Sequence, residues 1–356
     1  MPKGWEEQMR MTGAMQRVGV VASAEELLRL NMLYVTNDGS FQSAAVGMAL
    51  TTGKTLSKVA AFKRIKNSGS WLRWMAKELM LSDKVNLTKP DFLGKRDVVL
   101  IDASEGALKG GVLSSWRLHY SFDLFNFQCR DMEVTKISEG ERLTRHKINS
   151  NDIILADRMY CTINGMEYVA SQESRFAMRF RVNAFYLYDE KGYKQELLPQ
   201  IRHLEALESI DKQYFYKNSN GQLKPVRIVV MKKDAAAIEA RRKKICGKIG
   251  KSKFEKLSPD TEEFNEYIAI ATNLDYSNEQ ILELYRARWQ VEQVFFRLKS
   301  LFGYGEIPSK RDDTVQAWFY GKLLLAALCE CILKRMPFPP ETEPYITDIV
   351  GAKFMV

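Results

Sequence analysis

Two aspartates and one glutamate stand where carboxylates could hold metal ions. Asp102 follows the apolar run at residues 98–101, and Asp157 follows a second apolar run at 153–156. Such short runs are typical of buried strands, where an acid is costly unless it is paired or bound to a cation. Glu292 stands in a helical segment that could cover the sheet. Three carboxylates suit Mg²⁺ or Mn²⁺, and two such ions can activate the attacking oxygen and stabilise the leaving oxygen of a phosphodiester.

The segment around Glu292 carries further groups that suit phosphate chemistry. Its pattern is Tyr285-x₂-Arg288-x₃-Glu292-x₆-Lys299. At ~100° per residue, seven residues return to within roughly 20° of the start, so Tyr285, Glu292 and Lys299 share one stripe of a helix. The same residues also fit an ordinary amphipathic helix with an Arg288–Glu292 pair, and each aspartate alone also fits a helix N-cap or an ion pair.

Positive charge is concentrated in two blocks of the chain. The formal net charge is +9, residues 1–96 hold 15 Lys and Arg against 8 Asp and Glu, and residues 227–256 hold 11 against 3. Separated basic surfaces suit a polyanion such as DNA, although a solvated basic face gives the same signal. The candidate DNA contacts in these blocks are Lys58, Lys63 and Arg64 in the first, and Arg241, Arg242, Lys243 and Lys244 in the second.

The elements that must position these groups follow from periodicity. Helical patterns, one of them amphipathic and basic at 56–67, fill residues 20–81, as in small helix-turn-helix domains. From residue 97 the pattern changes to strands at 98–101, 116–127, 132–137, 153–156, 176–182 and 267–272. Capping patterns begin helices at Ser23 and Ser277, and the second helix runs unbroken from about 278 to 301. Another helix spans about 314–334. The fold class is therefore α/β.

Composition argues against several other classes of protein. The longest apolar stretch, 323–329, is too short for a membrane span, and the first residues lack the apolar core of a signal peptide. Five cysteines without a Cys-x-x-Cys pair predict reduced thiols in a cytoplasmic protein rather than a zinc site or disulfides. The three histidines are scattered and more typical of structural roles.

These features together resemble the DDE transposases of the insertion-sequence-four group. The likeness runs over about residues 20–335 and rests on four segments. They are Val-Val-Leu-Ile-Asp102-Ala-Ser, Ile-Ile-Leu-Ala-Asp157-Arg158-Met-Tyr160, the Tyr285–Arg288–Glu292–Lys299 signature, and the N-terminal Leu-Ser-Lys-Val-Ala-Ala-Phe-Lys-Arg.

The resemblance implies an RNase H-like mixed sheet core with an inserted β-rich subdomain, preceded by a small all-α DNA-binding domain. The implied boundaries are a helical DNA-binding domain at 1–94, the first part of the core at 95–184, and the insertion at 185–265. The second part of the core, with the glutamate helix, follows at 266–336, and a C-terminal tail at 337–356.

The resemblance also implies cut-and-paste transposition with two Mg²⁺ or Mn²⁺ ions held by Asp102, Asp157 and Glu292. Water activated by one ion nicks the transposon end, the freed 3′-OH attacks the other strand to give a hairpin, and the same site joins the end to target DNA. Tyr285, Arg288 and Lys299 would grip phosphates, and Arg158 and Tyr160 would assist. The implied partners are double-stranded DNA, at terminal inverted repeats and target, and a second copy in a homodimer; the implied location is the cytoplasm, at the bacterial nucleoid.

One departure and two alternatives remain open from sequence. The family holds a flipped base against aromatic residues, often a Trp of the insertion, but the segment 185–265 contains no Trp. Phe264 and the nearby Tyr267 are the candidates to hold the flipped base instead. The first alternative is a transposase-derived DNA-binding protein without catalysis, which the intact signature disfavours. The second is a two-carboxylate glycosidase, which the basic blocks and the signature helix disfavour.

Overall fold

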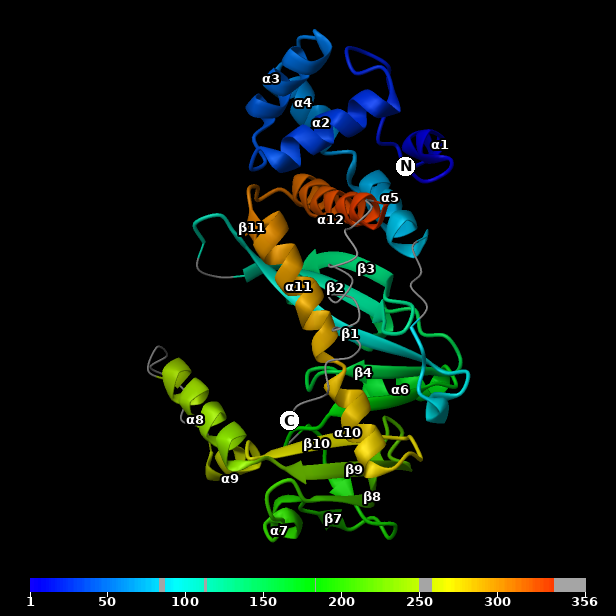
Figure 1. Ribbon diagram of the computed structural model, residues 1–356, viewed down its shortest axis with the longest axis vertical. Coiled ribbons are helices and arrows are strands. Elements are labelled where there is room, and N and C mark those ends of the chain that lie inside the picture. Colours follow the sequence, from blue (N-terminus) through cyan, green and yellow to red (C-terminus); the bar gives the residue numbers. More distant parts are fainter. Residues whose placement is uncertain (83–86, 112–113, 183, 250–257, 336–356) are drawn as a thin grey trace. The chain divides into compact units, whose positions relative to one another are not determined.

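The computed structural model describes residues 1–82, 87–111, 114–182, 184–249 and 258–335 (Figure 1). Side chains at 82, 114, 244–249, 301–302 and 333–335 are also outside the description, as is the predicted tail at 337–356. The chain divides into two compact units. A helical unit comprises Met1–Asp83 with Leu298–Val356, and a sheet unit comprises Lys84–Arg297.

The helical unit is built from short helices with serine caps. The side chains of Ser23, Ser40 and Ser57 each accept the backbone N–H three residues on, which satisfies a donor that the first helical turn leaves free. The elements are α1 (Trp5–Met11), α2 (Ala24–Thr36), α3 (Phe41–Thr52), α4 (Lys58–Ile65), α5 (Gly69–Ser82), the end of α11 (Trp289–Phe302), β11 (Glu306–Ile307) and α12 (Asp312–Arg335). The helical pattern expected for 20–81 is therefore present.

The long helix α12 packs against the N-terminal helices. A Cβ at Gly321 would lie 2.6 Å from Cγ1 of Val35 in α2 and 3.8 Å from Leu72 in α5, so only glycine allows the helices to approach this closely. The boundaries implied by the resemblance placed this helix in the core, within 266–336. The structure divides the chain differently, because α12 buries its apolar face among helices far away in the sequence.

The burial of α12 also explains its apolar composition. Asp312–Ile332 is long and apolar enough to cross a membrane, and more than half of its most apolar window is buried inside the structure. The uninterrupted apolar run at 323–329 is therefore only part of a longer apolar stretch. A core helix surrounded by other helices is apolar on most of its faces, which gives the same composition as a membrane span.

The sheet unit has one mixed sheet with the strand order β3-β2-β1-β4-β5-β10-β9-β8-β6-β7. Strands β1, β4 and β5 are parallel, and the other neighbours pair antiparallel. The strands are β1 (Asp97–Leu108), β2 (Ser114–Asp123), β3 (Gln128–Lys136), β4 (Asp152–Ala156), β5 (Arg175–Arg179), β6 (Leu187–Tyr188), β7 (Lys194–Gln195), β8 (Ser209–Lys217), β9 (Leu223–Lys232) and β10 (Tyr267–Thr272). This large mixed sheet with helices fits the RNase H-like core expected from the sequence.

The segment 185–265 is strand-rich, as predicted, but it extends the core sheet. β9 pairs with β10 along its length, from Tyr267 opposite Lys232 to Thr272 opposite Arg227. The described strands of the segment thus continue the core sheet at its edge instead of forming a sheet apart (Figure 1). The helical elements of the sheet unit are η1 (Asp91–Leu93), η2 (Ile137–Glu139), η3 (Leu143–Arg145), α6 (Ile163–Ser171), α7 (Leu198–Ile201), α8 (Ala235–Ile249), α9 (Pro259–Phe264) and α10 (Asn278–Arg286), followed by the start of α11.

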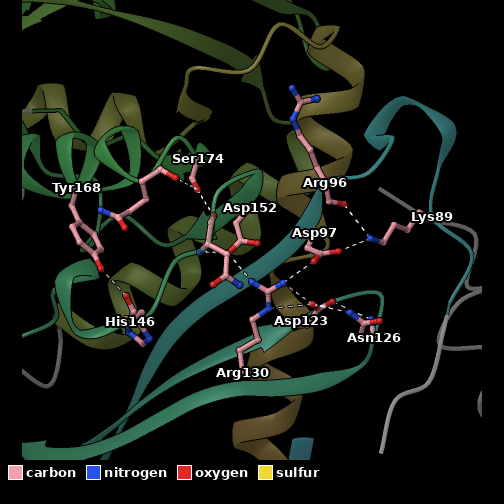
Figure 2. A network of polar contacts seen from close by, with 12 residues as sticks. Lys89, Arg96, Asp97, Asp123, Asn126, Arg130, His146, Asp152, Tyr168 and Ser174 are labelled. Carbon is pink, nitrogen blue, oxygen red and sulfur yellow. Dashed lines mark hydrogen bonds and ion pairs between the residues drawn. The ribbon is translucent and has the colours of Figure 1, made fainter.

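A network of buried ion pairs holds the amino ends of β1 and β4 together (Figure 2). The guanidinium of Arg130 contacts Asp97 at 2.9 Å, Asp152 at 2.6 Å and Asp123 at 3.1 Å. The side chains of Asp123 and Asp152 are only 2% and 3% exposed, and their charges are balanced by this guanidinium together with the N–H groups of Asn126 and Asn149. Lys89 adds a second cation at 2.5 Å from Asp97. The network thus ties the four strands β1 to β4 together at the sheet end opposite the acids of interest.

The glutamate helix is interrupted, contrary to the unbroken helix predicted from periodicity. Ser277 begins α10 with the predicted capping box, but α10 ends at Arg286 and α11 begins at Trp289. Between them the N–H of Arg288 bonds to the carbonyl of Tyr285 at 3.1 Å, and that of Val291 bonds to Arg288 at 3.2 Å. These i→i+3 bonds tighten the turn and shift the helical phase. The stripe expected for the signature residues is therefore broken at Arg288.

Candidate active site

Asp102 and Asp157 lie side by side on neighbouring parallel strands. Ile101 of β1 pairs with Ala156 of β4; Asp102 is the next residue of β1, and Asp157 is the first residue after β4. Parallel strands in register direct equivalent side chains to the same face, so the two carboxylates share one face of the sheet. Asp102 does not end its strand, because β1 continues to Leu108 beside β2. Only the parallel pairing of β1 with β4 ends before Asp102.

Arg288 connects Asp102 to Glu292. Its Nη1 lies 3.1 Å from Oδ2 of Asp102, and its Nη2 lies 2.5 Å from Oε1 of Glu292. The side chains of Arg288 and Asp102 are 15% and 16% exposed, whereas that of Glu292 is 55% exposed. The break between α10 and α11 gives Arg288 this position. The i,i+4 pair considered from sequence thus exists, and the same guanidinium also contacts an acid 186 residues away.

The electrostatics of Asp102 reflect a crowded acidic site. Burial, helped by the neighbouring carboxylates of Asp157 and Glu292, raises the pKa of Asp102 to about 7. The N–H of Ala103, 2.8 Å from Oδ1, and the charge of Arg288 act in the opposite direction. Asp157 accepts the N–H of Met159 at 2.7 Å. Because the surroundings of Asp102 disfavour its ionised form, a cation bound at this site would be stabilising.

The three acids offer the oxygen donors that a hard divalent ion prefers, but their side chains do not lie together in one group. Within the described residues no group of three or more His, Cys, Asp or Glu side chains lies close enough to hold a metal ion. The guanidinium of Arg288 stands between Asp102 and Glu292, and only Asp102 and Asp157 are direct neighbours. Carboxylate oxygens fit Mg²⁺ or Mn²⁺. Arg288 supplies the positive charge that the acids require in this arrangement.

The remaining predicted site residues are two members of the signature and two residues that follow Asp157, and their surroundings differ. Tyr285 lies with its ring 5.8 Å from the guanidinium carbon of Arg288, and burial raises its pKa to about 12. Tyr160 is 1% exposed, and burial raises the pKa of its hydroxyl, so it does not offer that group to a ligand at the surface. Arg158 is exposed beside Asp157. Lys299 is exposed too, but it belongs to the helical unit.

The predicted basic DNA contacts divide into available and occupied side chains. Lys58 and Lys63 are exposed on α4, whereas Arg64 donates to the backbone oxygen of Arg17 at 2.6 Å. On α8, Arg242 lies 2.6 Å from Glu266, and Lys243 lies 3.5 Å from Glu239. Arg241 is half-buried and faces other cations, and the side chain of Lys244 lies outside the described residues.

The two aromatic candidates for a flipped base are part of the core. Phe264 is 8% exposed and Tyr267 is 2% exposed, and both belong to the hydrophobic cluster of the sheet unit. Phe264 contacts Phe180 and Tyr267 at centroid distances of 6.3 and 6.4 Å. Neither ring can stack on a base without first leaving that core, so this suggestion from sequence is not supported.

Two charged residues that were not among the predicted site residues adjoin Asp157. Met178 of β5 pairs with Ala156, so Arg179 takes the place next to Asp157 on the following strand. Glu141 also adjoins this acid, and burial raises its pKa, while Nε of Arg117 lies 3.2 Å from its carboxylate. The alternation of arginines with apolar residues in 175–181 signalled Arg179, because a charged residue in a central strand needs a reason. No comparable signal marked Glu141.

Comparison of the chain's sequence with known proteins identifies its family. The sequence profile described as "Transposase DDE domain" matches residues 120–328, which include Asp157 and Glu292 and begin after Asp102. The chain is 25% identical over 350 residues to the putative transposase InsL for insertion sequence element IS186A of Escherichia coli (strain K12), which covers 96% of this chain and 94% of the relative.

Two further relatives carry similar names. The transposase for insertion sequence element IS421 of Escherichia coli is 25% identical over 351 residues, covering 96% of this chain and 94% of the relative. The transposase for IS231F of Bacillus thuringiensis subsp. israelensis is 28% identical over 235 residues, covering 61% of this chain and 49% of the relative. With the family profile matching more than half of its length, the chain belongs to the DDE transposases of the insertion-sequence-four group.

Proposed function

We propose that this protein binds the ends of an insertion sequence and catalyses metal-dependent cleavage and joining of DNA strands. Asp102, Asp157 and Glu292 hold two divalent ions, Mg²⁺ or Mn²⁺. When bound, these ions supply Lewis-acid activation of the attacking oxygen and stabilisation of the leaving oxygen. The nicked 3′ end attacks the opposite strand to give a hairpin, and the same carboxylates serve target joining.

The observation that carries this proposal is the pairing of Asp102 and Asp157 one residue beyond a parallel ladder, with Glu292 joined to them by Arg288. Carboxylates from two central strands and one helix gather negative charge around Arg288, and buried negative charge of this kind favours a cation. In the absence of DNA and metal, Arg288 meets that need.

The chain's own cations bind and orient the DNA. Arg288 can offer a planar fork to a phosphate once a metal ion has replaced it as counter-ion to the acids, and Tyr285 packs against that guanidinium. Lys299 and Arg158 are exposed and act as point charges or forks for neighbouring phosphates. Tyr160, being buried, supports the loop after Asp157.

The proposal extends to the helical unit and to assembly. Lys58 and Lys63 of α4 are exposed on a short basic helix, which suits contact with a DNA groove, and we assign them to recognition of the element's ends. Two copies act together on the two ends, in the cytoplasm at the nucleoid. The domain boundaries at 94 and 184 that the resemblance implies belong to this proposal as well.

Cleavage of an end duplex tests the function. The DNA that flanks the gene is inspected for inverted repeats, and a labelled duplex of that sequence is incubated with protein and Mg²⁺ or Mn²⁺. A denaturing gel should show a nick and then a hairpin. Glu292→Gln should lower the rate by at least about 100-fold, because several kcal/mol of transition-state stabilisation depend on a metal ligand.

A matched control comes from the preceding helix. Glu283→Gln removes an exposed carboxylate of α10 that has no proposed role, and it should leave the rate unchanged. Wild-type protein that binds the duplex specifically but does not cut it with either ion would refute catalysis and favour a transposase-derived DNA-binding protein. Equal loss in both variants would show that Glu292 has no special part.

A further inference from the structure

One arginine holds the stretch of chain that leads from β10 into α10. Arg227 lies in β9 opposite Thr272, the last residue of β10, so its side chain can reach the chain just beyond that strand. Its Nη1 donates to the backbone oxygens of Leu274 and Tyr276, and its Nη2 donates to Oδ1 of Asn278 at 2.8 Å. Asn278 is the first residue of α10. The guanidinium of Arg227 thus fixes the connection along its whole length.

Arg227 is itself held in place on the sheet. Its Nε lies 2.7 Å from Oδ2 of Asp211 on β8, and its side chain is only 18% exposed. Each nitrogen of the guanidinium therefore donates to a group of the sheet unit. A guanidinium engaged in this way has few donors left for a phosphate, although Arg227 is the first residue of the basic block at 227–256. Its contacts suit the fixing of the protein's own chain better than the binding of DNA.

A second arginine contacts the same connection through the side chain of Tyr276. Nη1 of Arg96 donates to the hydroxyl of Tyr276 at 3.0 Å, and the ring of Phe92 meets the tyrosine ring edge-on at a centroid distance of 5.1 Å. The segment that carries Phe92 and Arg96 is in turn fixed to β1, because Lys89 donates to the backbone oxygen of Arg96 at 3.2 Å and to Asp97 (Figure 2). Strand β9 and the segment before β1 therefore both hold the connection to α10.

The position of this connection determines where α10 begins. Ile281 and Leu284 bury one face of α10, but apolar contact is non-directional and tolerates a shift along the helix axis. Hydrogen bonds require defined distances and angles, so the bonds to the connection fix the axial position as well. Arg288 follows α10 closely and contacts both Asp102 and Glu292. A shift at the start of α10 would therefore move the groups that stand over the acids of the sheet.

We propose that Arg227 and Arg96 are positioning residues for strand cleavage, because they set the place of α10 and hence of Arg288 and Glu292. Neither touches DNA or metal in this role. The inference rests on the proposed function insofar as a cleavage rate reports the position of Glu292. It gives the first residue of the basic block a part in the chemistry that its charge alone does not suggest.

Replacement of Arg227 by lysine tests the proposal in the full-length protein. Lysine keeps the positive charge but lacks the planar fork that donates to several acceptors at once. Arg227→Lys should lower the cleavage rate at saturating end duplex by about 100-fold, the order of loss expected when a reacting group is misplaced by about 1 Å. The duplex concentration that gives half the maximal rate should not change. The matched control is Arg202→Lys, at an arginine that pairs with Glu263 and is 53% exposed; it should leave both quantities unchanged.

A smaller change keeps the proposal testable if Arg227→Lys does not fold. Tyr276→Phe removes only the hydroxyl that Arg96 contacts and keeps the ring beside Phe92. It should lower the maximal rate by about tenfold, as the loss of a supporting hydrogen bond around a metal site does, again without a change in duplex affinity. A Tyr276→Phe protein that cleaves at the wild-type rate would contradict the part assigned to Arg96.

Salt dependence distinguishes positioning from a direct contact with DNA. If Arg227 bound a phosphate, Arg227→Met would lower the slope of log association constant against log salt concentration by about 0.9. Positioning predicts the wild-type slope. A fall of that size, or equal cleavage rates for Arg227→Lys and Arg202→Lys, would overturn the proposal.

Hydrogen exchange in the metal-free protein gives a readout that needs no cleavage. Arg227→Lys should speed the exchange of the α10 amides by about tenfold, which corresponds to the loss of one or two hydrogen bonds, and leave the amides of β1 and β4 unchanged. If wild-type protein binds the end duplex but does not cut it, the proposed function fails and exchange decides the positioning by itself. Equal exchange of α10 in Arg227→Lys and Arg202→Lys would then refute it.

Discussion

Replacing Asp102 by asparagine should stabilise the metal-free protein while removing a proposed metal ligand. The side chain of Asp102 is 16% exposed, and burial together with Asp157 and Glu292 raises its pKa to about 7 from an ordinary value of 3.8. Because the pKa is higher in the folded state, folding favours the protonated form. That contribution to stability is complete below pH 3.8 and is lost as the pH rises through 7.

The size of the effect follows from the two pKa values. A shift of one unit corresponds to about 1.36 kcal/mol, so a rise from 3.8 to about 7 costs about 4 kcal/mol once Asp102 is ionised in both states. The attraction of Arg288 is already contained in this value, since it lowers the same pKa. Asparagine has the same shape without the charge, so Asp102→Asn should gain about 4 kcal/mol at pH 8.

The measurement is urea unfolding in the presence of EDTA, followed by hydrogen exchange of the amides in β1 and β4. Two compact units need not unfold together, and these amides report on the sheet unit alone. The gain should be large at pH 8 and small near pH 4. Glu292→Gln is the control, because its carboxylate is 55% exposed and its removal should change the stability by only about 0.5 kcal/mol. A gain that is absent at pH 8, or equal at both pH values, would refute this reasoning.

Three other changes test separate parts of the structure. Arg288→Ala should tighten Mn²⁺ binding roughly tenfold in isothermal titration, because a guanidinium no longer competes for Asp102, while binding of the end duplex weakens; unchanged Mn²⁺ affinity would contradict this. Arg130→Met should cost about 3–5 kcal/mol in urea unfolding, since it leaves two nearly inaccessible aspartates without this counter-ion, and the loss should shrink as the pH falls and Asp152, whose pKa burial already raises, becomes protonated; a loss independent of pH would point to packing instead. Gly321→Ala should destabilise the helical unit by about 1–3 kcal/mol, because its Cβ would overlap Val35; a stabilised variant would show that α12 can move away from α2.

The strands that carry the two aspartates could be predicted because their signal is local. Residues 98–101 and 153–156 are uninterrupted apolar runs, and the structure buries all of them in β1 and β4. The strand at 267–272 was predicted with its observed bounds for the same reason. The same patterns suggested that the acids would meet, because an acid at the end of a buried strand needs a cation; the parallel register that places Asp102 beside Asp157 is visible only in the structure.

The interruption of the glutamate helix could not be predicted from periodicity. A repeat of seven residues predicts the same stripe whether or not the helix is continuous, and the turn at Arg288 depends on i→i+3 bonds that involve only backbone atoms. The contact from Arg288 to Asp102 likewise spans 186 positions. The sequence thus identified Arg288 and the three acids, but not that the guanidinium lies between Asp102 and Glu292.

The place of α12 was missed for a related reason. Its apolar pattern predicts burial but does not name the partner, and the close approach to α2 depends on Gly321, which carries no hydrophobic signal at all. A packed helix and a membrane-crossing helix share the same composition, and only the buried contacts distinguish them.

The three residues that directly follow the paired positions of the parallel strands differ in charge. Asp102, Asp157 and Arg179 occupy equivalent positions on β1, β4 and β5, so charge changes from negative to positive across three neighbouring strands. Under the proposed function, the acids repel a phosphodiester until metal ions neutralise them, whereas the guanidinium of Arg179 attracts it. We therefore expect DNA to be held first on the side of β5, with the scissile phosphate over the acids only when metal is bound. This order follows from the sheet topology together with the identity of one residue on each strand.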